Sequence, residues 1–140
     1  MKAHYLLFSL ICLAAPFAGM AQVQRMAVPV VNTSYSKGDN GYFFALRDVP
    51  LSQNQFIFSA DLLKKAIYVK GDRNIALSHT MTVKTAKGFD MYFSANDYNI
   101  TLAIKEARAM DDQTIEYKGT LFVRHGSEKE KIAVHGFQNR

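Results

Sequence analysis

Cysteine and tryptophan are the residues that this sequence most plainly lacks. Its 140 residues contain one cysteine, Cys12, and no tryptophan. A single cysteine cannot form an intrachain disulfide, and it cannot build a zinc site from several thiolates. The Cys…Trp…Cys pattern of immunoglobulin domains is excluded as well. The fold must therefore be stabilised by packing and hydrogen bonding alone.

The sequence also lacks a long block of one charge. It carries 17 Lys+Arg against 12 Asp+Glu, a net charge of +5, and the basic residues are scattered along the chain. Nucleic-acid-binding proteins usually concentrate their basic residues in blocks or stripes, so we expect no nucleic-acid partner. A mildly basic surface suits an anionic membrane or cell-envelope polymer, and it equally suits an ordinary solvated surface.

Catalytic and cofactor motifs are missing too. The sequence contains no G-x-S-x-G elbow, no phosphate-binding glycine loop and no H-E-x-x-H motif. Asp111 and Asp112 are adjacent, so on an extended chain they face opposite ways and do not form an acid–base pair. His125 and His135 are expected on opposite faces of one hairpin, where they cannot share a metal ion. We therefore expect no enzymatic activity, no cofactor and no metal site.

One long apolar run is present, and it lies at the N-terminus. It covers residues 5–15, follows Lys2 and ends before Pro16. This length suits the core of a secretory signal peptide and is shorter than the roughly 20 residues of a membrane-spanning helix. Gly19 and Ala21 supply the small side chains that signal peptidase requires. We expect cleavage after Ala21 and export to the periplasm or the medium.

Cleavage would change the composition of the chain. It removes 21 of the 140 residues, including Cys12 and Lys2, which leaves 16 Lys+Arg against 12 Asp+Glu and a net charge of +4. The exported part, residues 22–140, would have no thiol and no stable transmembrane anchor. The alternative is an uncleaved anchor, because the apolar stretch reaches spanning length if it continues to Ala21.

The rest of the chain predicts an all-β fold. Residues 22–40 look like an irregular lead-in with one possible edge strand, and residues 41–140 form a single domain. In that domain short apolar runs of period two alternate with turn signals. Strands are expected at 42–49, 55–59, 66–70, 75–84, 88–95, 99–106, 115–124 and 131–136, with one short helical turn near 60–65. Seven or eight short strands indicate an antiparallel β-sandwich or a small β-barrel. Residues 103–110 also contain good helix formers, so their conformation is left open.

The hairpin over 75–95 carries the candidate ligand site. A turn centred on Ala86 would pair Met81 with Met91 and His79 with Phe93, which places their side chains on one face. The candidate ligand-binding residues are His79, Met81, Phe89, Met91 and Phe93. Methionine and phenylalanine make an adaptable apolar surface, and His79 would be its polar anchor. The same face equally suits an ordinary protein core.

A second hairpin ends the chain. A turn over residues 126–129 would pair Val123 with Ile132 and Leu121 with Val134. Gly119 and Gly136 would then face each other, which indicates a place where a bulky group packs closely.

Two functions remain open from the sequence. The first is a non-catalytic binding or envelope-associated module that meets a protein or a cell-envelope polymer. The second is a small periplasmic barrel that carries an apolar, lipid-like molecule. The two differ in where the ligand binds, because the first uses the outer surface and the second uses the interior.

Overall fold

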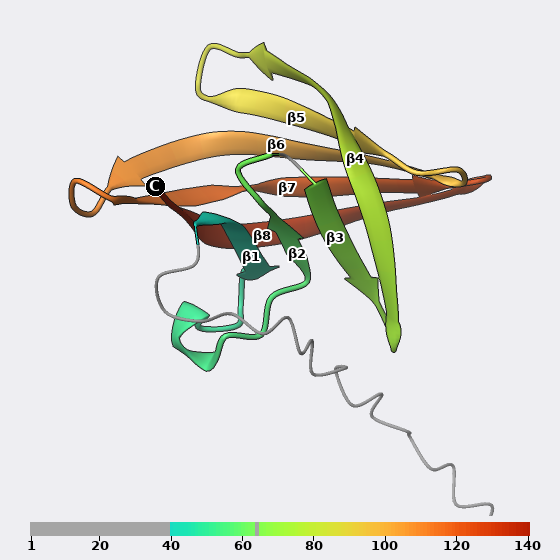
Figure 1. Cartoon of the computed structure of the whole chain (residues 1–140), viewed down its shortest axis with the longest axis horizontal. Helices are drawn as coiled ribbons and strands as arrows, with labels where there is room; N and C mark the ends of the chain where they lie inside the picture. Colours follow the sequence, from blue (N-terminus) through green and yellow to red (C-terminus); the bar gives the residue numbers. More distant parts are fainter. Residues whose placement is uncertain (1–39, 64) are drawn as a thin grey trace, which may run out of the picture.

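The fold is known from a computed structural model, which describes residues 40–63 and 65–140. The described chain is a closed antiparallel barrel of eight strands (Figure 1). The strands are β1 Gly41–Leu46, β2 Phe58–Ala60, β3 Lys65–Lys70, β4 Arg73–Lys84, β5 Phe89–Ser94, β6 Tyr98–Ala109, β7 Thr114–His125 and β8 Glu128–Asn139. The predicted signal peptide, and the lead-in apart from Asn40, lie outside the described residues. No helix in the described part is long and apolar enough to cross a membrane.

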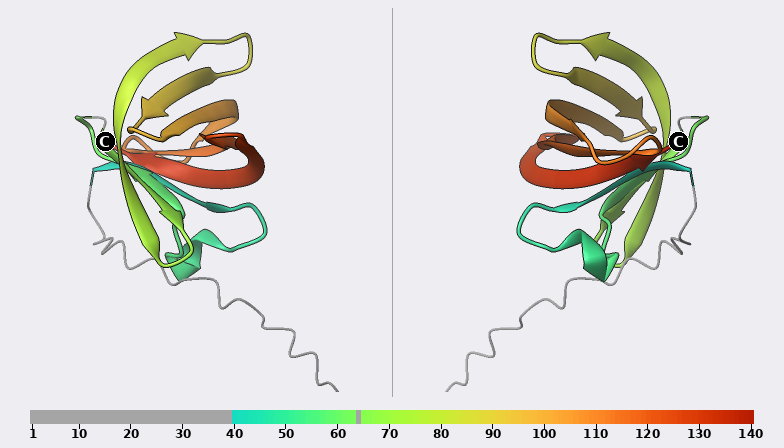
Figure 2. Two further views of the ribbon diagram at one scale, coloured as in Figure 1. Left: turned by 90° about the vertical axis from the view of Figure 1, so that its right-hand side faces the viewer. Right: turned by 90° about the vertical axis from the view of Figure 1, so that its left-hand side faces the viewer.

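The strands follow one another around the barrel in sequence order. Each pairs with the next, and β1 pairs with β8 from Gly41 opposite Asn139 to Leu46 opposite Val134. Figure 2 shows the sheet curling so that its first and last strands meet. This pairing decides between the two predicted architectures in favour of a barrel. Closure pairs the first strand with the last, so the described sheet has no unpaired terminal strand.

The segment left open between strand and helix is a strand. Residues 103–109 belong to β6, where Ala107 lies opposite Tyr117 and Ala109 opposite Ile115. The ladder to β7 shifts register between Ile104 and Glu106, as in a β-bulge. Pairing along the full length of β7 therefore overrides the local helix propensity of this segment.

The helical turn lies elsewhere than predicted. A single 3-10 turn spans Leu51–Gln53, between β1 and β2. Near 60–65 the chain instead makes a tight hairpin turn, in which the Lys65 amide donates to Asp61 Oδ1 over 2.9 Å and the Asp61 amide donates to the Lys65 carbonyl over 2.9 Å. The prediction was wrong at this position because β2 pairs with β3, which closes the segment into a hairpin whose turn is held by Asp61.

The C-terminal hairpin also has a tighter turn than predicted. His125 lies opposite Glu128, so the turn contains only Gly126 and Ser127, and Gly126 adopts a φ of 60°. Leu121 therefore pairs with Ile132 rather than with Val134. Because the register differs by two residues, every side chain keeps the predicted face.

Gly119 and Gly136 do mark close approaches, although they do not face each other. A Cβ atom on Gly119 would lie 2.1 Å from the Ala103 carbonyl oxygen, and one on Gly136 would lie 2.0 Å from the Phe43 carbonyl oxygen. The group packed against each glycine is thus the backbone of a neighbouring strand. Glycine is needed here because any side chain would push the bent strands apart.

Inward-facing side chains fill the middle of the barrel. The largest fully buried ones are Phe44, Phe58, Met91, Phe93, Ile100, Leu102, Ile104, Leu121 and Val134, all of which belong to one packed cluster. Each has at most about 2% of its surface exposed. They therefore contact one another rather than line an open chamber.

A second, smaller cluster lies outside the barrel wall. Phe43, Ala45 and Phe56 are buried there with Phe137 packed against them, because the β1–β2 connection folds over the outer faces of β1 and β8. His135 Nε2 lies 2.6 Å from the Val49 carbonyl oxygen and fastens this connection to β8. The seam that closes the barrel is therefore covered.

Candidate functional site

Four of the five predicted ligand residues share the inner wall of the barrel. Phe93 and Met91 are each 2% exposed, and Phe89 is half-buried with its ring centroid 5.5 Å from that of Tyr117. His79 lies toward the rim, where its ring meets Phe93 edge-on at 5.5 Å. Its Nε2 lies 2.7 Å from Thr82 Oγ1. These side chains pack against one another in the structure. Ligand binding by them therefore stays a prediction.

Met81 lies on the opposite side of the wall. The β4–β5 register shifts between His79 and Met81, so that Met81 pairs with Tyr92 and Thr82 pairs with Met91. The predicted pairing of Met81 with Met91 was therefore wrong. The extra residue in β4 sends Met81 outward, where 48% of it is exposed.

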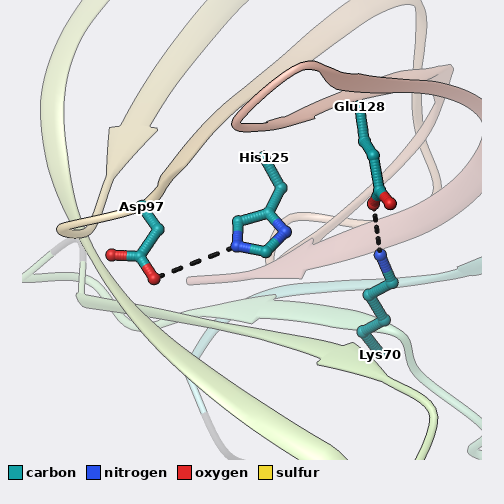
Figure 3. Close-up of polar contacts among 4 residues, drawn as sticks. All are labelled: Lys70, Asp97, His125 and Glu128. Carbon is teal, nitrogen blue, oxygen red and sulfur yellow. Dashed lines mark ion pairs between the residues drawn. The ribbon is translucent and has the colours of Figure 1, made fainter.

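Four polar side chains lie at one end of the barrel and form two pairs (Figure 3). Lys70 Nζ lies 3.6 Å from Glu128 Oε2, and His125 Nε2 lies 3.9 Å from Asp97 Oδ2. The His125 ring stacks on Tyr98 with centroids 4.1 Å apart. The Lys70–Glu128 pair is partly exposed, so it contributes at most about 1 kcal/mol, and the His125–Asp97 contact is an ion pair only while His125 is protonated.

Tyr68 belongs to the same end of the barrel. Its side chain faces inward, and its hydroxyl is hydrogen-bonded to the Glu130 carboxylate. Burial, then the charge of Glu130, raises the pKa of Tyr68 to about 12. Glu128 and Glu130 therefore both lie on the inner face of β8.

Metal binding finds no support in this geometry. Within residues 40–63 and 65–140, no three His, Asp or Glu side chains lie close enough together to hold a metal ion. His125 faces the barrel end, whereas His135 contacts the outer β1–β2 connection. The two histidines point to opposite faces, in agreement with the sequence-based expectation.

The outer wall of β4–β8 carries two rows of side chains that the sequence analysis missed. Strand pairing aligns the first row as Met81, Tyr92, Thr101, Phe122 and Lys131. It aligns the second row as Ser94, Asn99, Arg124 and Lys129. We call these nine residues the outer aromatic–basic face. No short sequence motif marks this face, because its members come from five strands and meet only through the register.

Large apolar groups remain exposed on this face. Phe122 is 39% exposed, and Lys131 Nζ lies 5.8 Å from the centre of its ring. A hollow of about 410 Å³ lies beside Met81 and Tyr92. Its other walls are Thr80, Phe93, Ser94, Asn99, Ile100 and Thr101. The face thus combines flat apolar groups with hydroxyl, amide and cationic groups.

A second outer hollow, of about 610 Å³, lies over β1–β4. Phe43, Ile67 and Ala76 line it together with Asp61 and Lys65. Asn40, the first described residue, also lines it, so this hollow borders the part of the chain that the structure does not describe.

The chain was compared with known families, curated proteins and solved structures. No family model, no curated protein and no solved structure matches the chain.

Proposed function

We propose that this chain is an exported, non-catalytic binding module of the cell envelope, and that it meets its partner through the outer aromatic–basic face. One observation carries the proposal: Met81 and Phe122 stay exposed on the outer wall while the interior is filled. Exposed apolar groups with polar and cationic neighbours are typical of interaction surfaces. Export agrees with the apolar N-terminal run.

The second candidate is a barrel that carries an apolar ligand inside. It is favoured by the convergence of His79, Phe89, Met91 and Phe93 on one inner wall. A lipid-sized ligand would have to displace side chains that are now packed, such as Met91 and Phe93. Native mass spectrometry of protein from its own host tests this candidate, which requires a lipid-sized mass to co-purify.

An envelope-binding measurement tests the proposed function. The fraction of protein that sediments with washed envelopes of the host is compared between the wild type and the double variant Met81→Ser/Phe122→Ser. We expect the double variant to lose most of the bound fraction, because it removes the exposed apolar groups of the face. Leu63→Ser/Met110→Ser is the matched control, since these side chains are 85% and 53% exposed on turns away from the face.

Two results would contradict the proposal. One is equal sedimentation of the wild type and the face variant, and the other is an equal loss for the control. Mass spectrometry of the sedimented protein also tests the predicted export. Cleavage of the signal peptide after Ala21 requires that the N-terminal residue be Gln22.

A further inference from the structure

The outer aromatic–basic face has an electrostatic imbalance of its own. Arg124 and Lys129 lie directly opposite each other on β7 and β8, and both side chains are exposed. Like charges in a cross-strand pair are unfavourable unless an anion lies nearby. Lys131, exposed in the adjoining row, adds a third cation. Within the described residues no ion pair joins any of the three to an acidic side chain.

The acidic residues of β8 do not neutralise these cations. Glu128 pairs with Lys70, and Glu130 is hydrogen-bonded to Tyr68, both on the inner side of the strand. On other elements, Asp97 lies on the β5–β6 turn and faces His125, and Asp90 lies one row further toward the β4–β5 hairpin. The two rows themselves contain no acidic residue. An anionic partner would therefore complement the face.

The apolar groups narrow the class of anion. Tyr92 and Phe122 lie in one row with Thr101 between them, so their strands are roughly 9.6 Å apart at about 4.8 Å per strand. Aromatic ring faces attract the weakly positive C–H groups on a pyranose ring. Thr101 and Asn99 offer hydroxyl and amide groups for hydrogen bonds to sugar hydroxyls. The row thus presents two stacking positions with a hydrogen-bonding position between them.

These observations together define a partner. We infer that the outer aromatic–basic face binds an acidic polysaccharide, with sugar rings on Tyr92 and Phe122 and its carboxylates on Arg124, Lys129 and Lys131. This inference rests on the proposed function and names the partner of the same face. A membrane surface is the weaker match, because Leu63, the most exposed large apolar side chain among residues 40–63 and 65–140, lies on the β2–β3 turn and outside the face, with 85% of it exposed.

Calorimetric titration with defined oligosaccharides tests the inference. The full chain is titrated with hexamers of galacturonic acid and of mannuronic acid at low salt, and with uncharged maltohexaose for comparison. We expect at least one uronate hexamer to bind, maltohexaose to bind at least about tenfold more weakly, and the affinity to fall as salt rises. Amide chemical-shift changes must concentrate on β5–β8.

Two variants separate the charge from the stacking. Arg124→Gln/Lys129→Gln should weaken uronate binding about tenfold or more, and Phe122→Ser should weaken it by a similar factor. Lys84→Gln/Lys87→Gln is the control, because it removes two exposed cations near the β4–β5 hairpin and outside the face. Far-UV circular dichroism verifies that each variant keeps its fold.

The outcomes distinguish this inference from the proposed function. If neither uronate hexamer binds while the face variants still lose envelope sedimentation, the acidic-polysaccharide partner is wrong and the envelope-binding face stands. Binding only to phosphatidylglycerol vesicles would replace the polysaccharide by a membrane. Equal weakening by the control variant would show that net charge, rather than this face, drives the binding.

Discussion

Tyr68 illustrates how the filled interior governs a single ionisable group. Only 3% of this side chain is exposed, and its hydroxyl is hydrogen-bonded to Glu130. Burial disfavours the phenolate, and the neighbouring negative charge disfavours it further, so the pKa of Tyr68 rises from 10.0 to about 12. The folded barrel therefore holds this proton at a pH where the unfolded chain has released it.

Alkaline stability is expected to depend on this residue. Tyr68 contributes fully below pH 10, and its contribution falls as the pH rises through about 12, because the unfolded state ionises first. Tyr68→Phe cannot ionise, so its free energy of unfolding should fall less steeply between pH 10 and pH 12 than that of the wild type. Urea denaturation at several pH values measures both slopes.

At pH 7, in contrast, the same variant is expected to be less stable than the wild type. Tyr68→Phe removes the hydrogen bond to Glu130, which should cost about 1 kcal/mol at pH 7. Identical slopes for the two proteins in the alkaline range would show that Tyr68 ionises at the same pH in both states.

At the scale of the element, alternation in the sequence predicted most strands and their faces. The period-two pattern in β4, β5, β7 and β8 is imposed by one buried side, so it could be read without a structure. The bulge between His79 and Met81 could not be predicted, because it depends on how β4 pairs with β5. The two-residue turn at Gly126 escaped prediction for a similar reason, since Gly126-Ser127 and the four residues 126–129 both suit a turn.

The same limits apply to the candidate site. His79, Phe89, Met91 and Phe93 were placed together correctly, because they follow from alternation in two neighbouring strands. The outer aromatic–basic face was missed, because it needs the register of five strands at once. Phe122 and Lys131, for example, become neighbours only once the β7–β8 turn is fixed.

The β1–β2 connection is expected to act as a structural part of the barrel rather than as a free loop. Phe56 is fully buried against Phe43 and Phe137, with ring centroids 5.4 Å and 5.7 Å away. Phe56→Ala should therefore lower the free energy of unfolding by about 3–5 kcal/mol. Denaturant unfolding measures the loss, and hydrogen exchange should show it as faster exchange at the β1–β8 seam.

Ile67→Ala is the matched control for this substitution. Ile67 is 38% exposed on the outer wall of β3, so its truncation should cost less than about 1 kcal/mol. If Phe56→Ala unfolds like the control, the connection does not stabilise the seam.

At the scale of the whole molecule, closure joins the two ends of the described chain. Gly41 pairs with Asn139, so the first and last strands lie side by side. The β3–β4 turn is short and exposed, and a Cβ atom on Gly71 would meet nothing within 4 Å. New termini at this turn leave every strand pair intact.

A circular permutant tests this continuity. Residues 139 and 41 are joined by a short glycine–serine linker, and the chain is opened between Gly71 and Asp72. We expect the permutant to unfold cooperatively and to keep the far-UV spectrum of the parent, because ladder pairing is unchanged. Opening the chain within β7, between Leu121 and Phe122, is the control and should abolish cooperative unfolding. Equal behaviour of the two permutants would contradict a barrel that depends on its closed ladder.

The four residues Glu128 to Lys131 have one further consequence. Because side chains alternate along a strand, both glutamates lie on the inner face of the wall and both lysines lie on the outer face. A tetrapeptide with no net charge thus gives the inner face negative charges and the outer face positive charges. Substitution of Lys129 or Lys131 can therefore change the charge of the outer surface without altering the side chains inside the wall. A register shift of one residue in β8 would instead turn Ile132 and Val134 outward, so the buried face of the strand fixes which of these four charges lie outside.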